Sequence, residues 1–534
     1  MPHVITQSCC KDASCVAVCP VDCIRPARDE VFVDTSMLFI DPGVCIDCGA
    51  CVDACPVDAI QYDADLPASS TWLEQMNADY FRSHPLHSDF SSDAPAHPGV
   101  DAGALRVAIV GAGPAACYAA AELLESDGVE VALFERLPTP YGLIRAGVAP
   151  DHQDTKSVTR LFERAFDSDR LDCHLNVAVG RDITHADLLA HHHAVVYAVG
   201  ASASRRLGIP GEDLAGCVAA ADFVGWYNGH PDHADREFDL AGPTVVIVGN
   251  GNVSLDVARM LVLDARSVAV TDTADHALLA LDRSTVEEVV ILARRGPRHA
   301  AFSVAEFAAL GELPRIDVVI ESDDLAAEAG DDVETTWKLK TARAFAARSR
   351  TEGNKRIVFR FGVDPVRLRG SEAVDGIEIE TPAGTEVIDT ALVIRSIGYR
   401  GEAVTDLPFD DDAAVVPNDR GRVLGADGGP LDGVYVTGWI KRGARGVIGS
   451  NRTCAKETVD RLWSDHDAGR LTRDVRGAAA VRNLLRGRSI EPVDWDGWRR
   501  IDAAERDAVA ATGRPRRKLT ALDELVVAAS PRPE

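Results

Sequence analysis

The 534-residue sequence contains no uninterrupted apolar run close to the roughly 20 residues that a membrane span requires. Its N-terminus has neither a basic start nor an apolar stretch of signal-peptide length, so we expect a cytoplasmic protein in a reducing compartment. Basic residues are also outnumbered by acidic ones, 56 to 83. The net charge is −27, which argues against a nucleic-acid partner because phosphate binding needs basic clusters. A chain of this length is too long for one core, so we expect three or more domains.

Cysteine is scarce in most of the chain: of 13 cysteines, nine fall within the first 55 residues and the other four are scattered singly. In a cytosolic chain such density indicates metal binding rather than disulfides. The segment CIDCGACVDACP has the spacing CxxCxxCxxxCP of bacterial ferredoxins. In this pattern the first three cysteines bind one iron–sulfur cluster and the fourth binds a second. The four are Cys45, Cys48, Cys51 and Cys55.

A second half-motif, CCKDASCVAVCP, supplies the ligands that the first one lacks. The halves CVAVCPVDCI and CVDACPVDAI are near repeats, as a fold with pseudo-twofold symmetry requires. One cluster is therefore predicted on Cys19, Cys45, Cys48 and Cys51, and the other on Cys9, Cys15 and Cys55.

Asp12 stands where a four-cysteine site would have its central cysteine. Two alternatives follow: a three-iron cluster without a fourth ligand, which we favour, or a fourth iron bound by the Asp12 carboxylate, a poorer ligand than thiolate. Cys10 and Cys23 are spare in this scheme and are expected to be buried non-ligand thiols. Either would substitute if Cys9 is not a ligand. The first 62 residues resemble seven-iron bacterial ferredoxins, which implies a small α+β domain.

Residues 63–104 have a Ser-, His-, Asp- and Pro-rich composition typical of a linker. Within it, only the segment TWLEQMNADYF has the pattern of a short helix that docks on a neighbour. From Leu105 the chain reads as a strand, a glycine turn, an apolar helix and a strand that ends on Glu135. Gly111 makes the tight turn, and Gly113 lets the backbone approach a pyrophosphate at the helix N-terminus. Glu135 is placed to bind ribose hydroxyls, as for FAD or NAD.

A second unit of the same kind begins at PTVVIVGNGNVSLDVARML, with Gly249 and Gly251 in the corresponding roles and a helix over about 253–263. The next strand ends on Arg294 and Arg295, where the first unit has its glutamate. Arginine pairs with a 2′-phosphate through charge-assisted hydrogen bonds, so the second unit is predicted to prefer NADP.

Six ordered stretches make a more specific pattern: PYGLIRAGVAPDHQDTK, FVGWYNG, GNGNVSLDVARML, ARRGPRHAAFSVAEF, SIGYRG and VYVTGWIKRGARGVIGSN. They resemble the adrenodoxin-reductase branch of ferredoxin–NADP reductases. Together with the N-terminal segment they are similar to fused ferredoxin/ferredoxin–NADP reductases of actinobacteria. The resemblance implies the domain order 1–62 ferredoxin, 63–104 linker, 105–203 with 401–480 FAD-binding, 204–400 NADP-binding, and a tail at 481–534 on the FAD domain.

The resemblance also implies site residues. His152 matches the active-site histidine near the flavin, and Ala309 stands at or near a position where some relatives carry its acidic partner, so that ion pair is expected to be missing. FAD would be held by Gly111, Gly113, Ala115, Glu135, Leu143, Trp439, Gly446, Val447 and Ile448. NADP(H) would be held by Asn250, Gly251, Asn252, Val253, Arg294, Arg295, Glu306 and Gly446.

The expected activity is that of an NADP-dependent oxidoreductase, a ferredoxin–NADP reductase. Electrons would move between NADPH, FAD, the fused clusters and an external ferredoxin or other one-electron acceptor, in a direction the sequence leaves open. Two alternatives are a glutamate-synthase small-subunit-like oxidoreductase and an electron carrier with an inert reductase half. A thioredoxin-reductase-type enzyme is excluded because the cysteines outside the N-terminal segment are isolated. The tail residues Trp495 and Trp498 are expected to anchor on the FAD domain, and the basic run RPRRK is expected to be solvated surface.

Overall fold

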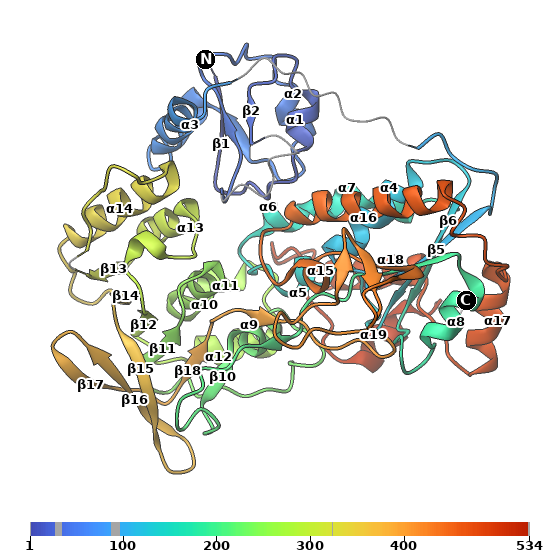
Figure 1. Ribbon diagram of the computed structural model, residues 1–534. Coiled ribbons are helices and arrows are strands. Elements are labelled where there is room, and N and C mark those ends of the chain that lie inside the picture. Colours follow the sequence, from blue (N-terminus) through green and yellow to red (C-terminus); the bar gives the residue numbers. More distant parts are fainter. Residues whose placement is uncertain (1, 27–34, 87–96, 323, 532–534) are drawn as a thin grey trace.

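The computed structural model describes residues 2–26, 35–86, 97–322 and 324–531 (Figure 1). A small N-terminal unit lies above two larger α/β units, with the second unit on one side and the first unit on the other. Among the described residues, no helix has both the length and the apolar character that a membrane crossing needs.

The N-terminal unit, residues 2–62 as far as described, pairs strand β1 with β4 and β2 with β3, both antiparallel, and packs helix α1 against α2. Its bounds are β1 His3–Ile5, α1 Ser14–Val18, β2 Ile24–Arg25, β3 Phe39–Ile40, α2 Ala50–Ala54 and β4 Ile60–Tyr62. Helix α3 (Trp72–Ser83) follows at the segment expected to form a docking helix, and it packs against α14 (Val333–Ala346) of the second unit. The indole of Trp337 donates a hydrogen bond of 3.1 Å to Asp79 across this contact.

The backbone of the N-terminal unit repeats every 36 residues. Left-handed conformations occur at three pairs with this spacing: Lys11 and Asp47, Ala13 and Gly49, and Asp22 and Asp58. The repeat matches Cys9 with Cys45 and Cys15 with Cys51, and it places Asp12 at the position of Cys48. The two half-motifs therefore have matching backbone conformations, as their near-identical sequences predict.

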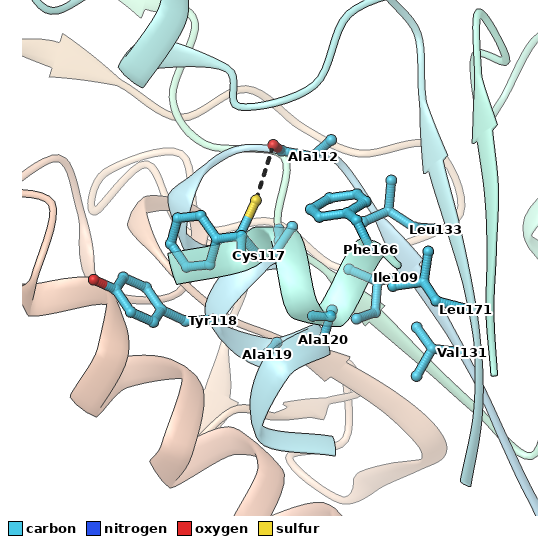
Figure 2. Close-up of a cluster of buried hydrophobic side chains, with 14 of the residues drawn as sticks. Ile109, Ala112, Cys117, Tyr118, Ala119, Ala120, Val131, Leu133, Phe166 and Leu171 are labelled. Atoms are coloured by element: carbon cyan, nitrogen blue, oxygen red, sulfur yellow. Dashed lines mark hydrogen bonds between the residues drawn. The ribbon is translucent and has the colours of Figure 1, made fainter. Parts of the chain in front are cut away.

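The first α/β unit is built on a seven-stranded sheet in the order β20-β21-β22-β8-β5-β6-β7. Strands β5 (Leu105–Val110) and β6 (Val129–Glu135) flank helix α4 (Pro114–Leu124), which confirms the expected strand–helix–strand motif. Figure 2 shows apolar side chains from β5, β6 and β7 (Leu171–Leu175) packed against α4, with the Cys117 thiol directed at the Ala112 carbonyl. Helices α16 (Ser450–Asp467) and α7 (Arg160–Phe166) pack on α4. Further members are α5 Leu143–Ala146, α6 Gln153–Lys156, α8 His185–His191, β8 Ala194–Tyr197, β20 Asn418–Asp419, β21 Arg422–Leu424, β22 Pro430–Val436 and α15 Trp439–Arg442.

The second α/β unit has a six-stranded sheet in the order β10-β18-β11-β12-β14-β13, in which every pair is parallel. Helix α10 (Asn252–Val262) follows β11 (Thr244–Val248), as expected from the second glycine motif. An antiparallel three-stranded sheet, β15-β16-β17, is appended. Further bounds are β10 Cys217–Ala219, α9 Ala220–Tyr227, α11 Ala265–Ala269, α12 Asp275–Asp282, β12 Glu288–Ala293, α13 Val304–Ala309, β13 Ile316–Glu321, β14 Lys355–Phe361, β15 Asp364–Gly370, β16 Val374–Thr381, β17 Gly384–Asp389 and β18 Val393–Arg395. The chain enters and leaves this unit along the paired strands β9 (Ala203–Ser204) and β19 (Tyr399–Arg400).

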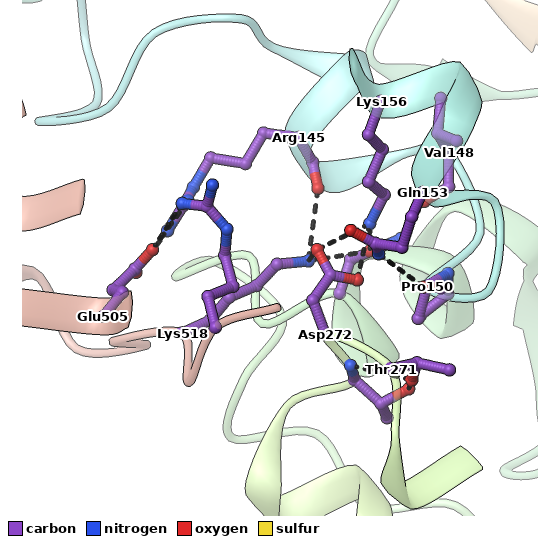
Figure 3. Close-up of polar contacts among 12 residues, drawn as sticks. Arg145, Val148, Pro150, Gln153, Lys156, Thr271, Asp272, Glu505 and Lys518 are labelled. Atoms are coloured by element: carbon purple, nitrogen blue, oxygen red, sulfur yellow. Dashed lines mark hydrogen bonds and ion pairs between the residues drawn. The ribbon is translucent and has the colours of Figure 1, made fainter. Parts of the chain in front are cut away.

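The C-terminal segment forms α17 (Ala478–Gly487), α18 (Trp495–Asp507) and α19 (Leu522–Ala529). Trp495 stacks on Phe166 of the first unit at 4.5 Å between ring centroids, and Trp498 is buried in the same core, so both anchors are confirmed. The expectation of a solvated RPRRK run is wrong. Arg514 forms a 2.8 Å ion pair with Asp275 of the second unit. Lys518 is buried beside Asp272 and Lys156, because this part of the tail lies between the two α/β units (Figure 3).

Candidate cofactor-binding and cluster-binding sites

The first glycine turn leaves room for a dinucleotide. Gly111 has φ +105°, and a Cβ there would lie 2.6 Å from the Ala198 carbonyl oxygen, so the turn requires glycine. A Cβ on Gly113 would meet no atom within 4 Å, because this residue faces open space at the start of α4. A pyrophosphate fits such a cradle, since the free amide groups of the helix N-terminus favour anions.

Glu135 ends β6 with its carboxylate fixed beside the same turn. It accepts hydrogen bonds from the backbone amides of Ala112 at 2.9 Å and Leu137 at 3.0 Å. Burial raises the pKa of Glu135, and the two amides oppose that rise. The carboxylate keeps lone pairs for ribose hydroxyls, which agrees with the role expected for it.

The C-terminal glycine-rich motif returns to the start of α4. A Cβ on Gly438 would lie 2.6 Å from the Ala115 Cβ, so the two segments touch. Trp439 opens α15, and its indole donates a hydrogen bond of 3.1 Å to the Arg445 carbonyl. The segment 446–448 lies directly before α16, and Leu143 opens α5 with 40% of its surface exposed. Of the residues expected to hold FAD, Gly111, Gly113, Ala115 and Glu135 lie together at the N-terminus of α4, where Gly142 and Gly438, the residues before Leu143 and Trp439, also approach. The remaining three, Gly446, Val447 and Ile448, lie before α16, which packs on α4.

The second glycine turn has the same geometry. Gly249 has φ +118°, and a Cβ there would lie 2.1 Å from the Ser396 carbonyl oxygen, whereas a Cβ on Gly251 would face open space. The Asn252 side chain accepts a 2.8 Å hydrogen bond from the Ser303 amide, which ties α10 to the cap of α13. Arg294 and Arg295 follow β12, are exposed, and form no ion pair within the described ranges. Both guanidinium groups are therefore available to a phosphate.

His152 lies where carboxylates from the second unit reach across. Its ring nitrogens are 3.9 Å from Asp256 and 3.7 Å from Glu306. Burial raises the pKa of Glu306, while His152 and Arg259 act to lower it. The missing acid at Ala309 therefore does not leave His152 without acidic neighbours, because α10 and α13 supply two. Sequence reasoning assigned Glu306 to NADP and missed Asp256, whose place near His152 depends on how the units pack.

Four thiols of the predicted outer set line one cavity of the N-terminal unit, and Cys48 among them is exposed. Cys23 lines the same cavity, with its sulfur 3.5 Å from that of Cys19. It is buried, as expected of a spare thiol, and it stands within reach of the same cluster position. The outer set is Cys19, Cys45, Cys48 and Cys51.

The predicted inner set, Cys9, Cys15 and Cys55, lies at the border with the first α/β unit. Burial raises the pKa of Cys15 well above its usual range, and the neighbouring thiols Cys9 and Cys55 add to the rise. Both of these neighbours pack against the apolar core of the N-terminal unit and also against that of the first unit. Cys10 is buried in the core of the first unit.

Asp12, at the missing-cysteine position, has its side chain only 2% exposed. Its carboxylate accepts a 2.8 Å hydrogen bond from the Tyr118 hydroxyl on α4 and lies 3.4 Å from the Arg452 guanidinium on α16. Neither Tyr118 nor Arg452 is singled out by a sequence pattern, so sequence reasoning missed both. It also missed Arg442, a partly buried arginine of the glycine-rich motif whose Nη1 has no hydrogen-bond partner among the described residues. Burial lowers its pKa, so an anionic group near Gly446 would stabilise it.

Comparison with known proteins identifies the family. A probable ferredoxin/ferredoxin–NADP reductase of Mycobacterium bovis is 47% identical over 100% of this chain and 96% of its own. The chain belongs to the ferredoxin/ferredoxin–NADP reductase family. The expected family resemblance is thereby confirmed, and the glutamate-synthase-like alternative loses its support.

Other comparisons match separate segments of the chain, and these segments agree with the ferredoxin and reductase parts expected from the sequence. Residues 105–291 match the pyridine nucleotide-disulphide oxidoreductase family, and residues 38–61 match the 4Fe-4S binding domain. The NADPH-ferredoxin reductase FprA of Mycobacterium leprae is 42% identical over 79% of this chain and 97% of its own. The structure of Mycobacterium tuberculosis FprA in complex with NADPH superposes with a TM-score of 0.76 at 40% identity, covering 80% of this chain and 99% of that one. The expected fold class, a ferredoxin domain followed by two Rossmann-like domains, is confirmed.

Proposed function

We propose that this ferredoxin/ferredoxin–NADP reductase family member moves electrons between NADP(H) and one-electron acceptors, with FAD in the first unit and NADP(H) in the second. The observation that carries the proposal is the pair of open glycine cradles, at Gly113 and Gly251, within one chain that also groups two sets of cysteines. Overall, one NADPH and two oxidised acceptors give NADP⁺, a proton and two reduced acceptors, or the reverse. Bound FAD supplies the exchange between two-electron and one-electron chemistry.

The chain's own residues bind and orient. Arg294 and Arg295 would pair with a 2′-phosphate, and the open turn before α10 would receive the pyrophosphate. His152 is the candidate catalytic residue, and the carboxylates of Asp256 and Glu306, 3.9 and 3.7 Å from its ring nitrogens, support this assignment. The remaining NADP contacts that we propose are Asn250, Asn252, Val253 and Gly446.

For the metal sites we propose a four-iron cluster on the outer set and a three-iron cluster on the inner set. Thiolates are the ligands that iron–sulfur clusters use, and the 36-residue repeat gives the outer set four of them but the inner set only three. The engagement of Asp12 with Tyr118 and Arg452 supports the three-iron alternative. A silent paramagnetic resonance spectrum of the oxidised protein would instead favour a completed four-iron site.

Anaerobic stopped-flow mixing of the purified protein with NADPH tests the activity. We expect rapid bleaching of the flavin absorbance, followed by reduction of an added external ferredoxin. Absence of bleaching would mean an electron carrier with an inert reductase half. A cytoplasmic location, which the N-terminal sequence predicts, stays a prediction.

A further inference from the structure

We propose that Asp12 is a docking residue: it fastens the N-terminal unit to the first α/β unit and thereby holds the inner cysteine set at the FAD-binding side. The functional consequence of this docking rests on the proposed function, whereas the docking itself is argued from contacts between protein residues. Asp12 stands where the ferredoxin pattern has a cysteine ligand, and its side chain binds the neighbouring unit instead of iron.

The Asp12 carboxylate is bound by Ser14 of its own loop and by two residues of the first α/β unit, Tyr118 and Arg452. A buried carboxylate is costly unless it is paired and hydrogen-bonded. Oδ2 accepts from the Tyr118 hydroxyl at 2.8 Å, Oδ1 accepts from the Ser14 amide at 3.0 Å, and Arg452 lies 3.4 Å from both oxygens. The same guanidinium donates to the Asp12 carbonyl at 3.2 Å. These partners satisfy both oxygens without iron.

The backbone beside Asp12 fits the first unit closely. The Gly449 amide donates a 2.9 Å hydrogen bond to the Cys10 carbonyl. A Cβ on Gly449 would lie 2.0 Å from the Lys11 carbonyl oxygen, so the approach leaves no room for a side chain. The backbone of Gly449 itself, at φ −65° and ψ −27°, suits any residue. Glycine is needed there for the contact between units, not for the local turn.

A second contact holds the other half of the inner set. The Ser157 hydroxyl donates a 2.7 Å hydrogen bond to the carbonyl of Pro56, the residue after Cys55. Two residues of the first unit therefore contact the loops that carry the inner set, Gly449 beside Cys10 and Ser157 beside Cys55. Gly449 follows the 446–448 segment, and Ser157 follows helix α6, which begins after His152. Exposed Cys48 places the outer set toward solvent, where an external acceptor can approach.

The test compares two glycine variants by hydrogen–deuterium exchange of the full-length holoprotein. Gly449→Ala inserts a methyl group into the contact, whereas Gly487→Ala adds one at a helix position with nothing within 4 Å. We expect Gly449→Ala to speed exchange in peptides covering residues 10–18 and 449–453 by about tenfold or more, as the loss of roughly one hydrogen bond and its packing implies. Unchanged exchange in Gly449→Ala would overturn the proposed docking.

Three further variants separate anchoring from iron ligation. Arg452→Ala should increase exchange in the same peptides, and Arg452→Lys should restore part of the protection because it keeps the charge. Asp12→Asn should weaken docking while the three-iron signal of the oxidised protein remains. A changed cluster spectrum in Asp12→Asn, with exchange unaltered, would make Asp12 an iron ligand instead.

Kinetics keep this proposal distinct from the proposed function. In Gly449→Ala, flavin bleaching by NADPH should persist. Electron transfer from the flavin to the clusters within one molecule, recognised by a rate that does not depend on protein concentration, should be lost. If flavin bleaching fails in the unsubstituted protein, the proposed function is wrong, and the exchange result still decides the docking.

Discussion

Arg259 on α10 and Asp151, the residue before His152, form an ion pair of 2.6 Å that joins the two α/β units. Arg259 also pairs with Asp256 at 2.8 Å, and its side chain is 6% exposed. Although burial acts to raise the pKa of Asp151, Arg259 outweighs it and lowers that pKa. One buried cation therefore organises the carboxylates that surround the candidate catalytic histidine.

Removing this cation should disturb both stability and activity. Arg259→Ala leaves Asp151, Asp256 and Glu306 facing one another, so we expect destabilisation on the order of 3 kcal/mol, as for a broken buried ion pair. Flavin bleaching by NADPH should slow in stopped-flow traces. Arg259→Lys keeps the charge without the fork-shaped geometry and should fall between the two. Bleaching at the normal rate in Arg259→Ala would contradict a positioning role for this network.

The same substitution in each of the two open glycine turns should weaken the binding of a different cofactor. Gly113→Ala places a methyl group where the FAD pyrophosphate is proposed to lie, and Gly251→Ala does the same for NADP(H), yet neither Cβ meets another atom. We expect Gly113→Ala to weaken FAD retention and Gly251→Ala to weaken NADPH binding, each by about 1–3 kcal/mol, the usual cost of overpacking. Fluorescence of released flavin and NADPH titration measure the two affinities. Equal effects of both variants on both ligands would refute the assignment.

The arginine pair after β12 should set the choice of nicotinamide cofactor. The double variant Arg294→Ala, Arg295→Ala removes the two exposed guanidinium groups and should lose most of the preference for NADPH over NADH. The measurement is kcat/KM with each cofactor. Arg350→Ala, another exposed arginine of the same unit, serves as the control. Unchanged discrimination in the double variant would rule out the proposed phosphate contact.

Two buried histidines should make the first unit sensitive to acid. Burial lowers the pKa of both His174 and His192 from 6.5 to about 4. Because the unfolded chain takes up these protons near pH 6.5 and the folded chain does not, stability is lost as pH falls from 6.5 toward 4. The loss is on the order of 3 kcal/mol for each ring.

The melting temperature, followed across this pH range, measures the effect. His174→Phe keeps the ring that stacks on Phe134 at 5.0 Å and should flatten the decline. His299→Asn, at an exposed position, should leave it unchanged. An equally steep decline in His174→Phe would exclude that histidine as a cause.

The sequence predicts local structure well where backbone geometry restricts the residue type. Glycine turns, the cysteine spacing and the acid or arginine at a strand end each depend on neighbours a few residues away, and the structure has strands and helices at those positions. The contacts of Asp12 are different in kind: Tyr118 lies 106 residues away and Arg452 lies 440 residues away. The sequence shows that a cysteine is missing, but not what the carboxylate binds.

The basic run near the C-terminus shows the same limit. Its composition is that of a solvated surface, yet Lys518 is 1% exposed beside Asp272 because the loop between α18 and α19 contacts both units. Ion pairs of this kind depend on how domains pack, and no local pattern encodes that packing.

An anaerobic titration of the oxidised full-length protein with NADPH, followed by absorbance and paramagnetic resonance, tests most directly whether electrons pass between the two halves of one chain. We predict that the three-iron signal disappears as the flavin bleaches, without any added ferredoxin. Persistence of that signal in excess NADPH, after the flavin has bleached and although dithionite abolishes it, would contradict the account.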